Sequence, residues 1–281
     1  MNKHPDKVID LPKINENISK LVLIMERLRN KENGCEWDLQ QTYKTIAPYT
    51  IEESYEVAEA IYENNMEKLC DELGDLLLQV IFHSQIAHER GDFHLEDVIS
   101  AVCKKMIRRH PHIFGDAKNK NISSIRKTWE EIKQKEREQF SKNKKTISLL
   151  DGISTTLPAI TRAMKLQQRA SEIGFDWTNI YQVFDKMYEE IEELKAEIEV
   201  EYPDKSRVQD EIGDILFVAT NIARIAGCEP ETSLILSNRK FEKRFKEMEN
   251  YTRDNNQSIE DLTPEELNSY WLMAKNMEKN L

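Results

Sequence analysis

An acidic motif occurs twice in this chain of 281 residues, in the same order and at closely similar spacing. In the first half, E-E-x-x-E at residues 52–56 is followed by E-x-x-D at residues 72–75. In the second half, E-E-x-x-E at residues 189–193 is followed by E-x-x-D at residues 211–214. Each motif ends on an Asp that opens an apolar stretch. This recurrence indicates an internal duplication, so we expect two similar halves.

The hydrophobic periodicity is helical throughout, and no convincing alternating strand pattern is found. The 8 glycines and 8 prolines lie mostly between the periodic segments, where helices end. Thr50–Glu53 and Thr263–Glu266 have the spacing of capping boxes, so each predicts a helix start. Gly91 follows a predicted helix end, and residues 110–112 are expected in a loop. Helices are expected at about residues 50–64, 66–88, 95–108, 124–140, 158–173, 180–200, 205–226 and 231–251, with a last one opened by Thr263.

The segment 141–156 interrupts the helical pattern with Lys, Ser, Thr and Gly, and a new helix is expected from Pro158. We therefore place the boundary between two domains in this segment, with the first at residues 1–146 and the second at residues 151–281. The predicted fold class is all-α, with tandem, duplicated helical domains.

The formal net charge of −11 argues against nucleic-acid binding and against anionic membrane surfaces, because both attract basic proteins. A small phosphorylated substrate stays compatible with this charge if bound cations reverse its sign locally. No apolar stretch is long enough to span a bilayer, and the N-terminus lacks the apolar core of a signal peptide. The widely separated cysteines favour a reducing compartment over disulfides or structural zinc, so a cytoplasmic location is expected. They are Cys35, Cys70, Cys103 and Cys228.

Helical spacing puts the acidic residues in pairs. Glu53 and Glu56 share one helix face, as do Glu72 and Asp75, because they lie three residues apart. If the two helices pack antiparallel, the four carboxylates converge and repel each other strongly unless cations neutralise them. Oxygen ligands of this kind favour Mg²⁺ or Mn²⁺, and Mg²⁺ commonly takes further ligands from substrate phosphates. The second copy repeats the set at Glu190, Glu193, Glu211 and Asp214.

The alternative interpretation is a solvated acidic face, which is the usual role of Glu-rich helices. The second pair of each copy argues against it, because Glu72 and Asp75 interrupt an otherwise strongly apolar helix. We therefore expect this pair to lie near a core, where charge needs a function. The same setting at Glu211 and Asp214 favours a metal site in both copies.

A basic pair with i, i+4 spacing follows each acidic motif, at Lys105 and Arg109 and at Lys240 and Arg244. These side chains could bind phosphate oxygens, or they could form ordinary surface salt bridges. Trp271 could stack on a nucleobase, although a Trp in a helical domain more often packs in a core. There is no H-E-x-x-H motif, no Glu-x-x-His pair of the di-iron type, no phosphate-binding loop and no G-x-S-x-G elbow.

The E-E-x-x-E, spacer, E-x-x-D signature resembles that of the MazG family of all-α nucleoside triphosphate pyrophosphohydrolases. Four further segments are similar to that family, and together the similar blocks cover nearly the whole chain, with residues 1–17 as an extension. The resemblance implies hydrolysis of a nucleoside triphosphate to a monophosphate and pyrophosphate, a requirement for Mg²⁺, and helical-bundle domains that form a homodimer. The four segments are residues 33–38, 45–50, 108–114 and 174–177.

The resemblance also implies roles for single residues. Glu189 and Glu52 become candidates for orienting or deprotonating the attacking water. Lys240 and Arg244 would hold phosphates, with Lys105 and Arg109 as first-half counterparts, and Trp271 would contact the base. The implied metal ligands are Glu190, Glu193, Glu211 and Asp214, with Glu53, Glu56, Glu72 and Asp75 as their first-half equivalents.

We expect broad base tolerance and a role in nucleotide-pool or stress-response housekeeping. Both copies keep every acidic residue, but the second has the longer basic face and Trp271, so we hypothesise that it is the more active copy. Two other interpretations stay open at this point. One is a helical interaction module without catalysis, and the other is a dUTPase-like nucleotidase with a narrow base preference.

Overall fold

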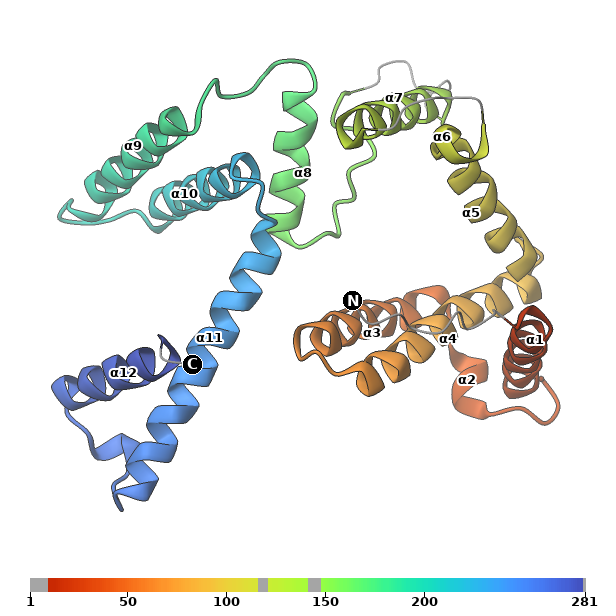
Figure 1. Ribbon diagram of the computed structural model, residues 1–281, viewed down its shortest axis with the longest axis horizontal. Coiled ribbons are helices and arrows are strands. Elements are labelled where there is room, and N and C mark those ends of the chain that lie inside the picture. Colours follow the sequence, from red (N-terminus) through yellow and green to blue (C-terminus); the bar gives the residue numbers. More distant parts are fainter. Residues whose placement is uncertain (1–9, 116–120, 141–147, 280–281) are drawn as a thin grey trace. The chain divides into compact units, whose positions relative to one another are not determined.

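A computed structural model describes residues 10–115, 121–140 and 148–279, and all regular elements in these ranges are helical (Figure 1). The all-α prediction is thereby confirmed. No helix in the described ranges is long and apolar enough to cross a membrane. The elements are α1 (Leu11–Leu28), α2 (Glu36–Gln40), α3 (Tyr43–Tyr62), α4 (Met66–Arg90), α5 (Leu95–Arg109), α6 (Pro111–Phe114), α7 (Ile122–Phe140), α8 (Ala159–Ser171), α9 (Ile180–Ile198), α10 (Lys205–Ile225), α11 (Pro230–Asp254), the 3₁₀ turn η1 (Ile259–Asp261) and α12 (Pro264–Lys279).

The chain divides into two compact units, Met1–Glu136 and Arg137–Leu281. In the first unit α3 and α4 pack along each other as a helical hairpin, α1 packs on α4, and α5 follows α4. In the second unit α9 and α10 form the corresponding hairpin, α8 packs on α10 and α11, and α12 packs on α11. Figure 1 shows both hairpins with their connecting loops. Each hairpin carries one copy of the acidic motif.

The first hairpin begins earlier than predicted. Helix α3 starts at Tyr43, where the side chains of Thr42 and Thr45 form reciprocal bonds to each other's backbone N–H groups, at 3.3 and 2.8 Å. The capping box predicted at Thr50 is therefore wrong. Thr50 lies inside the helix, and its hydroxyl donates to the carbonyl of Ile46 at 3.3 Å. Residues able to form a capping box stand at both places, but the helix starts at Thr42, so Ile46 is included in α3 and buried in the core.

Other predicted helix ends agree with the structure. Gly91 ends α4 in the left-handed region with φ of 72°, which glycine adopts without strain. Thr263 and Glu266 form the predicted capping box, since each side chain accepts from the other's backbone N–H.

Residues 110–112 were expected in a loop, but Pro111 begins the short helix α6. Proline fits this first position because it needs no amide partner there.

The core of the first unit is a cluster that spans α1, α3 and α4, and the side chains of Leu28, Tyr43, Leu78 and Leu95 pack around it. Because its members come from three helices, it fixes the α3–α4 hairpin against α1. The fully buried members are Met25, Ile46, Ile81, Phe82 and Ile86.

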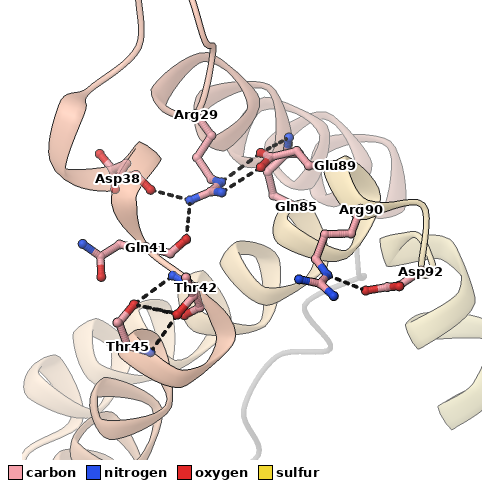
Figure 2. Close-up of polar contacts among 9 residues, drawn as sticks. All are labelled: Arg29, Asp38, Gln41, Thr42, Thr45, Gln85, Glu89, Arg90 and Asp92. Carbon is pink, nitrogen blue, oxygen red and sulfur yellow. Dashed lines mark hydrogen bonds and ion pairs between the residues drawn. The ribbon is translucent and has the colours of Figure 1, made fainter.

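Arg29 is a buried charged residue that packs against this core (Figure 2). Its side chain is 6% exposed and pairs in two-pronged fashion with the Glu89 carboxylate of α4, at 2.9 and 2.7 Å. It also donates to the carbonyls of Asp38 and Gln41, and it lies over the Phe82 ring. One guanidinium thus joins the end of α1, the α2–α3 connection and the last turn of α4.

In the second unit α9 and α10 pack along each other, and Val183 of α9 and Val218 of α10 are buried. Arg224, near the end of α10, pairs with Asp176, which lies just before α9, at 2.5 and 3.0 Å. Arg207 pairs with Glu197 at the other end of the hairpin. Apolar contact along the seam and an ion pair at each end therefore set the register of α9 against α10.

We predict that Arg29→Met lowers the free energy of unfolding by about 3 kcal/mol, because it leaves the partly buried Glu89 carboxylate and two carbonyls without their donor. The matched control is Arg90→Met, whose exposed ion pair with Asp92 contributes less than about 1 kcal/mol. Urea unfolding of the full chain, followed by circular dichroism, measures both. Equal effects of the two substitutions would contradict the role assigned to Arg29.

Candidate metal centre

The α3–α4 hairpin brings three predicted ligands of the first copy together. Glu53 and Glu56 lie one turn apart on α3, and Glu72 lies opposite on α4. One oxygen from each carboxylate lies within 4.8 Å of the others, and all three residues are half-buried. We call these three residues the first cluster.

The α9–α10 hairpin repeats this arrangement. Glu190 and Glu193 of α9 meet Glu211 of α10, again with one oxygen from each within 4.8 Å of the others. The Glu190 side chain is only 6% exposed. We call these residues the second cluster. Two helical hairpins of the same design therefore each concentrate three carboxylates at the seam between their helices.

The fourth predicted ligand of each copy, Asp75 or Asp214, is exposed and is not part of these close groups. Asp75 is nevertheless near enough to act on Glu53, since its charge helps to raise the pKa of that carboxyl. The surroundings of the acidic pair are less buried than we expected, because Leu73 and Leu77 of α4 are 48% and 42% exposed. Ligation by the two Asp residues stays a prediction.

The crowding of like charges changes the acidity of the clusters. Burial raises the pKa of Glu53, and the neighbouring carboxylates of Asp75 and Glu56 raise it further. Burial likewise raises the pKa of Glu72, with Glu56 adding to the effect, and that of Glu193, with Glu190 adding to it. Each cluster therefore holds more negative charge than its surroundings stabilise, which favours a bound cation.

Lys186 lies beside the second cluster and was not predicted from the sequence. Its ammonium lies 2.8 Å from the Glu190 carboxylate and 2.6 Å from that of Glu189, and these two partners raise the pKa of the lysine. The i, i+4 spacing of Lys186 and Glu190 on one helix is the signal that could have revealed it. The corresponding position of the first copy is Tyr49, so the first copy has no lysine at this place. There the charge of Lys68 on α4 offsets part of the rise in the pKa of Glu72.

The predicted water-activating residues lie outside the close groups. Glu52 is exposed on α3, and the Glu189 side chain is 56% exposed and bound to Lys186. Glu189 shares the Lys186 ammonium with Glu190, so its carboxylate lies at the rim of the second cluster. Glu52 is next to Glu53 in sequence, but adjacent helix positions do not face the same way. Their role in orienting or deprotonating water stays a prediction.

Arg109 forms contacts with other residues of the first unit. Its guanidinium forms a two-pronged pair with Glu136 of α7, at 3.2 and 2.6 Å, and lies over the ring of Trp129. Lys105 is exposed one turn earlier on α5. The phosphate-binding role of Arg109 therefore needs the Glu136 pair to open, and it stays a prediction.

Arg244 and Trp271 are brought together by α11 and α12. The guanidinium carbon lies 5.6 Å from the centre of the indole ring, and Phe241 packs against the same ring. Lys240 is exposed one turn before Arg244. α11 packs on α8, α10 and α12, so this group stands on the helix that follows the second hairpin (Figure 1).

The donor set of each cluster fits a divalent cation. Mg²⁺–oxygen bonds of about 2.1 Å put opposite ligands of one octahedral ion about 4.2 Å apart, so oxygens spaced as in the clusters reach one ion after small side-chain movements. All donors are carboxylate oxygens, which suit Mg²⁺ and Mn²⁺ better than zinc or copper. The raised carboxyl pKa values agree with this interpretation, because a cation would offset both the burial of the charges and the repulsion between them.

Comparison with known proteins agrees with this geometry. The MazG nucleotide pyrophosphohydrolase domain matches the chain twice, at residues 41–114 and 181–248. The chain belongs to the MazG family. The matched segments include both hairpins and all eight predicted metal ligands, together with Lys105, Arg109, Lys240 and Arg244, whereas Trp271 lies beyond them. Membership places the chain among hydrolases of phosphoric anhydrides.

Full-length relatives in the MazG family are similar over most of this chain. The nucleoside triphosphate pyrophosphohydrolase of Escherichia coli (strain K12) is 43% identical over 264 residues, which are 94% of this chain and 99% of that protein. The nucleoside triphosphate pyrophosphohydrolase/pyrophosphatase MazG of Thermotoga maritima is 44% identical over 256 residues, covering 91% and 94%. The crystal structure of a mazG-related protein from Thermotoga maritima matches 41% of this chain and 98% of its own, at 29% identity and a TM-score of 0.36.

The raised pKa of Glu193 predicts a pH-dependent effect on stability. The folded state holds this proton more tightly than the unfolded chain, so ionisation destabilises the cation-free fold above the ordinary glutamate pKa of about 4.3. Glu193→Gln should therefore raise the thermal midpoint at pH 7 in EDTA, and the gain should vanish as the pH falls toward 4. With Mg²⁺ added, only the unmodified protein should gain stability from binding at the second cluster.

The control is Glu192→Gln, the adjacent position, whose side chain is 71% exposed and pairs with Lys195. Differential scanning calorimetry across the pH range compares the variants. A Glu193→Gln midpoint that is no higher than that of Glu192→Gln at pH 7 in EDTA would contradict charge repulsion at the second cluster.

Proposed function

We propose that this chain is a Mg²⁺-dependent nucleoside triphosphate pyrophosphohydrolase that converts NTPs and dNTPs, with water, to monophosphates and pyrophosphate. The observation that carries the proposal is the pair of three-carboxylate clusters, each at the seam of a helical hairpin in a MazG-family chain. Three carboxylates so close together suit a phosphate substrate bound through a cation better than they suit an uncharged substrate.

In the second copy, Glu190, Glu193 and Glu211 would hold the cation, with Asp214 completing the set from one turn further along α10. The bound Mg²⁺ would polarise the phosphoryl oxygens and neutralise charge on the pyrophosphate leaving group. Glu189 would orient the attacking water and accept its proton from the rim of the cluster. The water oxygen bonds to the α-phosphorus while the bond from that phosphorus to the α,β-bridging oxygen breaks, with no covalent enzyme intermediate.

Lys240 and Arg244 would bind the phosphates, and Trp271 would stack on the base. Stacking is tolerant of base identity because every base has a flat π-face, which supports broad base tolerance. In the first copy the corresponding set is Glu53, Glu56, Glu72 and Asp75, with Glu52 for water and with Lys105 and Arg109 for phosphate. Mn²⁺, which also takes oxygen ligands, is the expected substitute for Mg²⁺.

We also propose that the protein is a homodimer. Leu73 and Leu77 form an exposed apolar stripe on α4, and the equivalent Ile212 and Leu216 form one on α10. An apolar stripe that recurs in both copies and stays uncovered within its own unit is typical of an interface. A second copy of the chain, which carries the same stripes, would cover them isologously.

The proposed domains remain residues 1–146 and 151–281. All four cysteines are exposed and unpaired, which supports a reducing, cytoplasmic location. Housekeeping of the nucleotide pool is the proposed role.

The catalytic proposal predicts a defined product. Incubation with a panel of NTPs and dNTPs plus Mg²⁺ should release monophosphate and pyrophosphate, separated by anion-exchange chromatography. Diphosphate with inorganic phosphate would overturn the reaction, conversion of dUTP alone would indicate the narrow nucleotidase, and no turnover would favour the interaction module. Glu193→Gln should lower kcat by at least about 100-fold, a larger loss than is typical for a residue that only supports a metal ligand.

Glu192→Gln is again the matched control and should keep nearly full activity. Glu56→Gln, at the equivalent position of the first copy, should lose less activity than Glu193→Gln if the second copy is the more active. Equal losses from these two substitutions would contradict that asymmetry.

The dimer proposal predicts that the full chain has twice its monomer mass of 33.0 kDa in light scattering coupled to size-exclusion chromatography. Leu216→Lys should shift the protein toward the monomer, because it puts a charge into an apolar interface. Tyr202→Lys is the control, since this residue is 84% exposed in the loop between α9 and α10. A monomeric unmodified protein would refute the proposal.

A further inference from the structure

Gln79 occupies a special place beside the first cluster. It lies one turn after Asp75 on α4 and is only 7% exposed. Its amide Nε2 points at the Glu53 carboxylate, at 3.4 Å, which is a long hydrogen bond. Its Oε1 is buried and has no hydrogen-bond partner in the described part of the chain. A buried acceptor without a partner costs free energy, so this oxygen is expected to have a donor in the working protein.

The second copy does not repeat this feature. The position equivalent to Gln79 is Val218, which is buried and carries no polar atom. There the most buried carboxylate, Glu190, is held by Lys186 instead, at 2.8 Å. The two clusters therefore use different residues to hold the same glutamate of the motif, a neutral amide in the first and a charged ammonium in the second.

The amide has the right chemistry for a residue that acts behind a cation site. Its N–H group can fix the orientation of a ligating carboxylate, while its oxygen can accept from a group that the cation itself carries. Mg²⁺ and Mn²⁺ usually keep some of their water, and such water is a strong donor. Residues that hydrogen-bond to the metal-ligating side chains, without touching the metal, orient those side chains and commonly affect metal affinity.

We propose that Gln79 is a positioning residue of the first cluster, holding Glu53 through its amide N–H and presenting its carbonyl oxygen to a water molecule of the bound divalent cation. This inference rests on the proposed cation at that cluster. It makes cation binding at the first cluster depend on a residue that the second copy lacks.

The test measures cation binding directly, without substrate. In the full chain, Glu193→Gln disables the second cluster, and this variant is the parent protein. Its Mn²⁺ binding is measured as the decrease of the free Mn²⁺ signal in electron paramagnetic resonance. Gln79→Met is then added, because methionine keeps the length of the side chain and removes both polar atoms. The control places Val218→Met in a Glu56→Gln parent, which puts the same methionine at the equivalent position of the second copy, where no polar atom is lost.

We expect Gln79→Met to weaken Mn²⁺ binding by about tenfold, the lower range for a residue that supports metal ligands. Val218→Met should leave the affinity of the second cluster unchanged. The thermal midpoint without cation provides a second measurement, and it should not fall in Gln79→Met, because an unsatisfied buried oxygen is replaced by an apolar group.

Unchanged Mn²⁺ affinity in Gln79→Met would overturn the inference while leaving the proposed function intact. A lower thermal midpoint with unchanged affinity would identify Gln79 as a packing residue only. Absence of Mn²⁺ binding in the Glu193→Gln parent would contradict the proposed cation at the first cluster, and the inference with it.

Discussion

Repulsion among carboxylates at the seam of each helical hairpin is the constraint on which the rest of this structure depends. Glu53, Glu56 and Glu72 lie close together, and Glu190, Glu193 and Glu211 repeat the arrangement. Burial, together with the charges of neighbouring carboxylates, raises the pKa of Glu53, Glu72 and Glu193. A helical pair gains stability by burying its seam, yet here the seam holds like charges. The surrounding helices must therefore keep the hairpin closed, which the buried core around Ile46 and the Arg29–Glu89 pair do in the first unit.

The duplicated hairpins meet this constraint with different chemistry. Lys186 places a positive charge against Glu190, so the second cluster is partly neutralised within the chain itself. Gln79 offers Glu53 a neutral donor in the first cluster, where the charge of Lys68 acts on Glu72 instead. A cation entering the second cluster competes with Lys186 for Glu190, whereas in the first cluster the equivalent Glu53 has the neutral amide of Gln79 as its partner. Two copies with the same acidic motif can thus differ in function.

Much of the fold and of the candidate site could be predicted from the sequence. Period-3.6 apolar patterns predicted most of the helices, although α1 and α2 were missed. Gly91 predicted the end of α4, because helices commonly end on a glycine in the left-handed region. The start of α3 was missed, since threonines at 42 and 50 both have the chemistry of a cap and only burial of Ile46 distinguishes them. Lys186 and Gln79 were missed because neither belongs to the acidic motif itself.

The sequence by itself determined which residues carry charge and how they repeat, since motif spacing follows from the covalent chain and helical periodicity. Only the tertiary structure decided which of those charges meet. It joined three carboxylates of each copy and left Asp75 and Asp214 exposed. It also engaged Arg109 with Glu136 and placed Arg244 over Trp271. The physical reason is that helix spacing fixes a residue's neighbours along its own helix, whereas contacts across a seam depend on the register that packing selects.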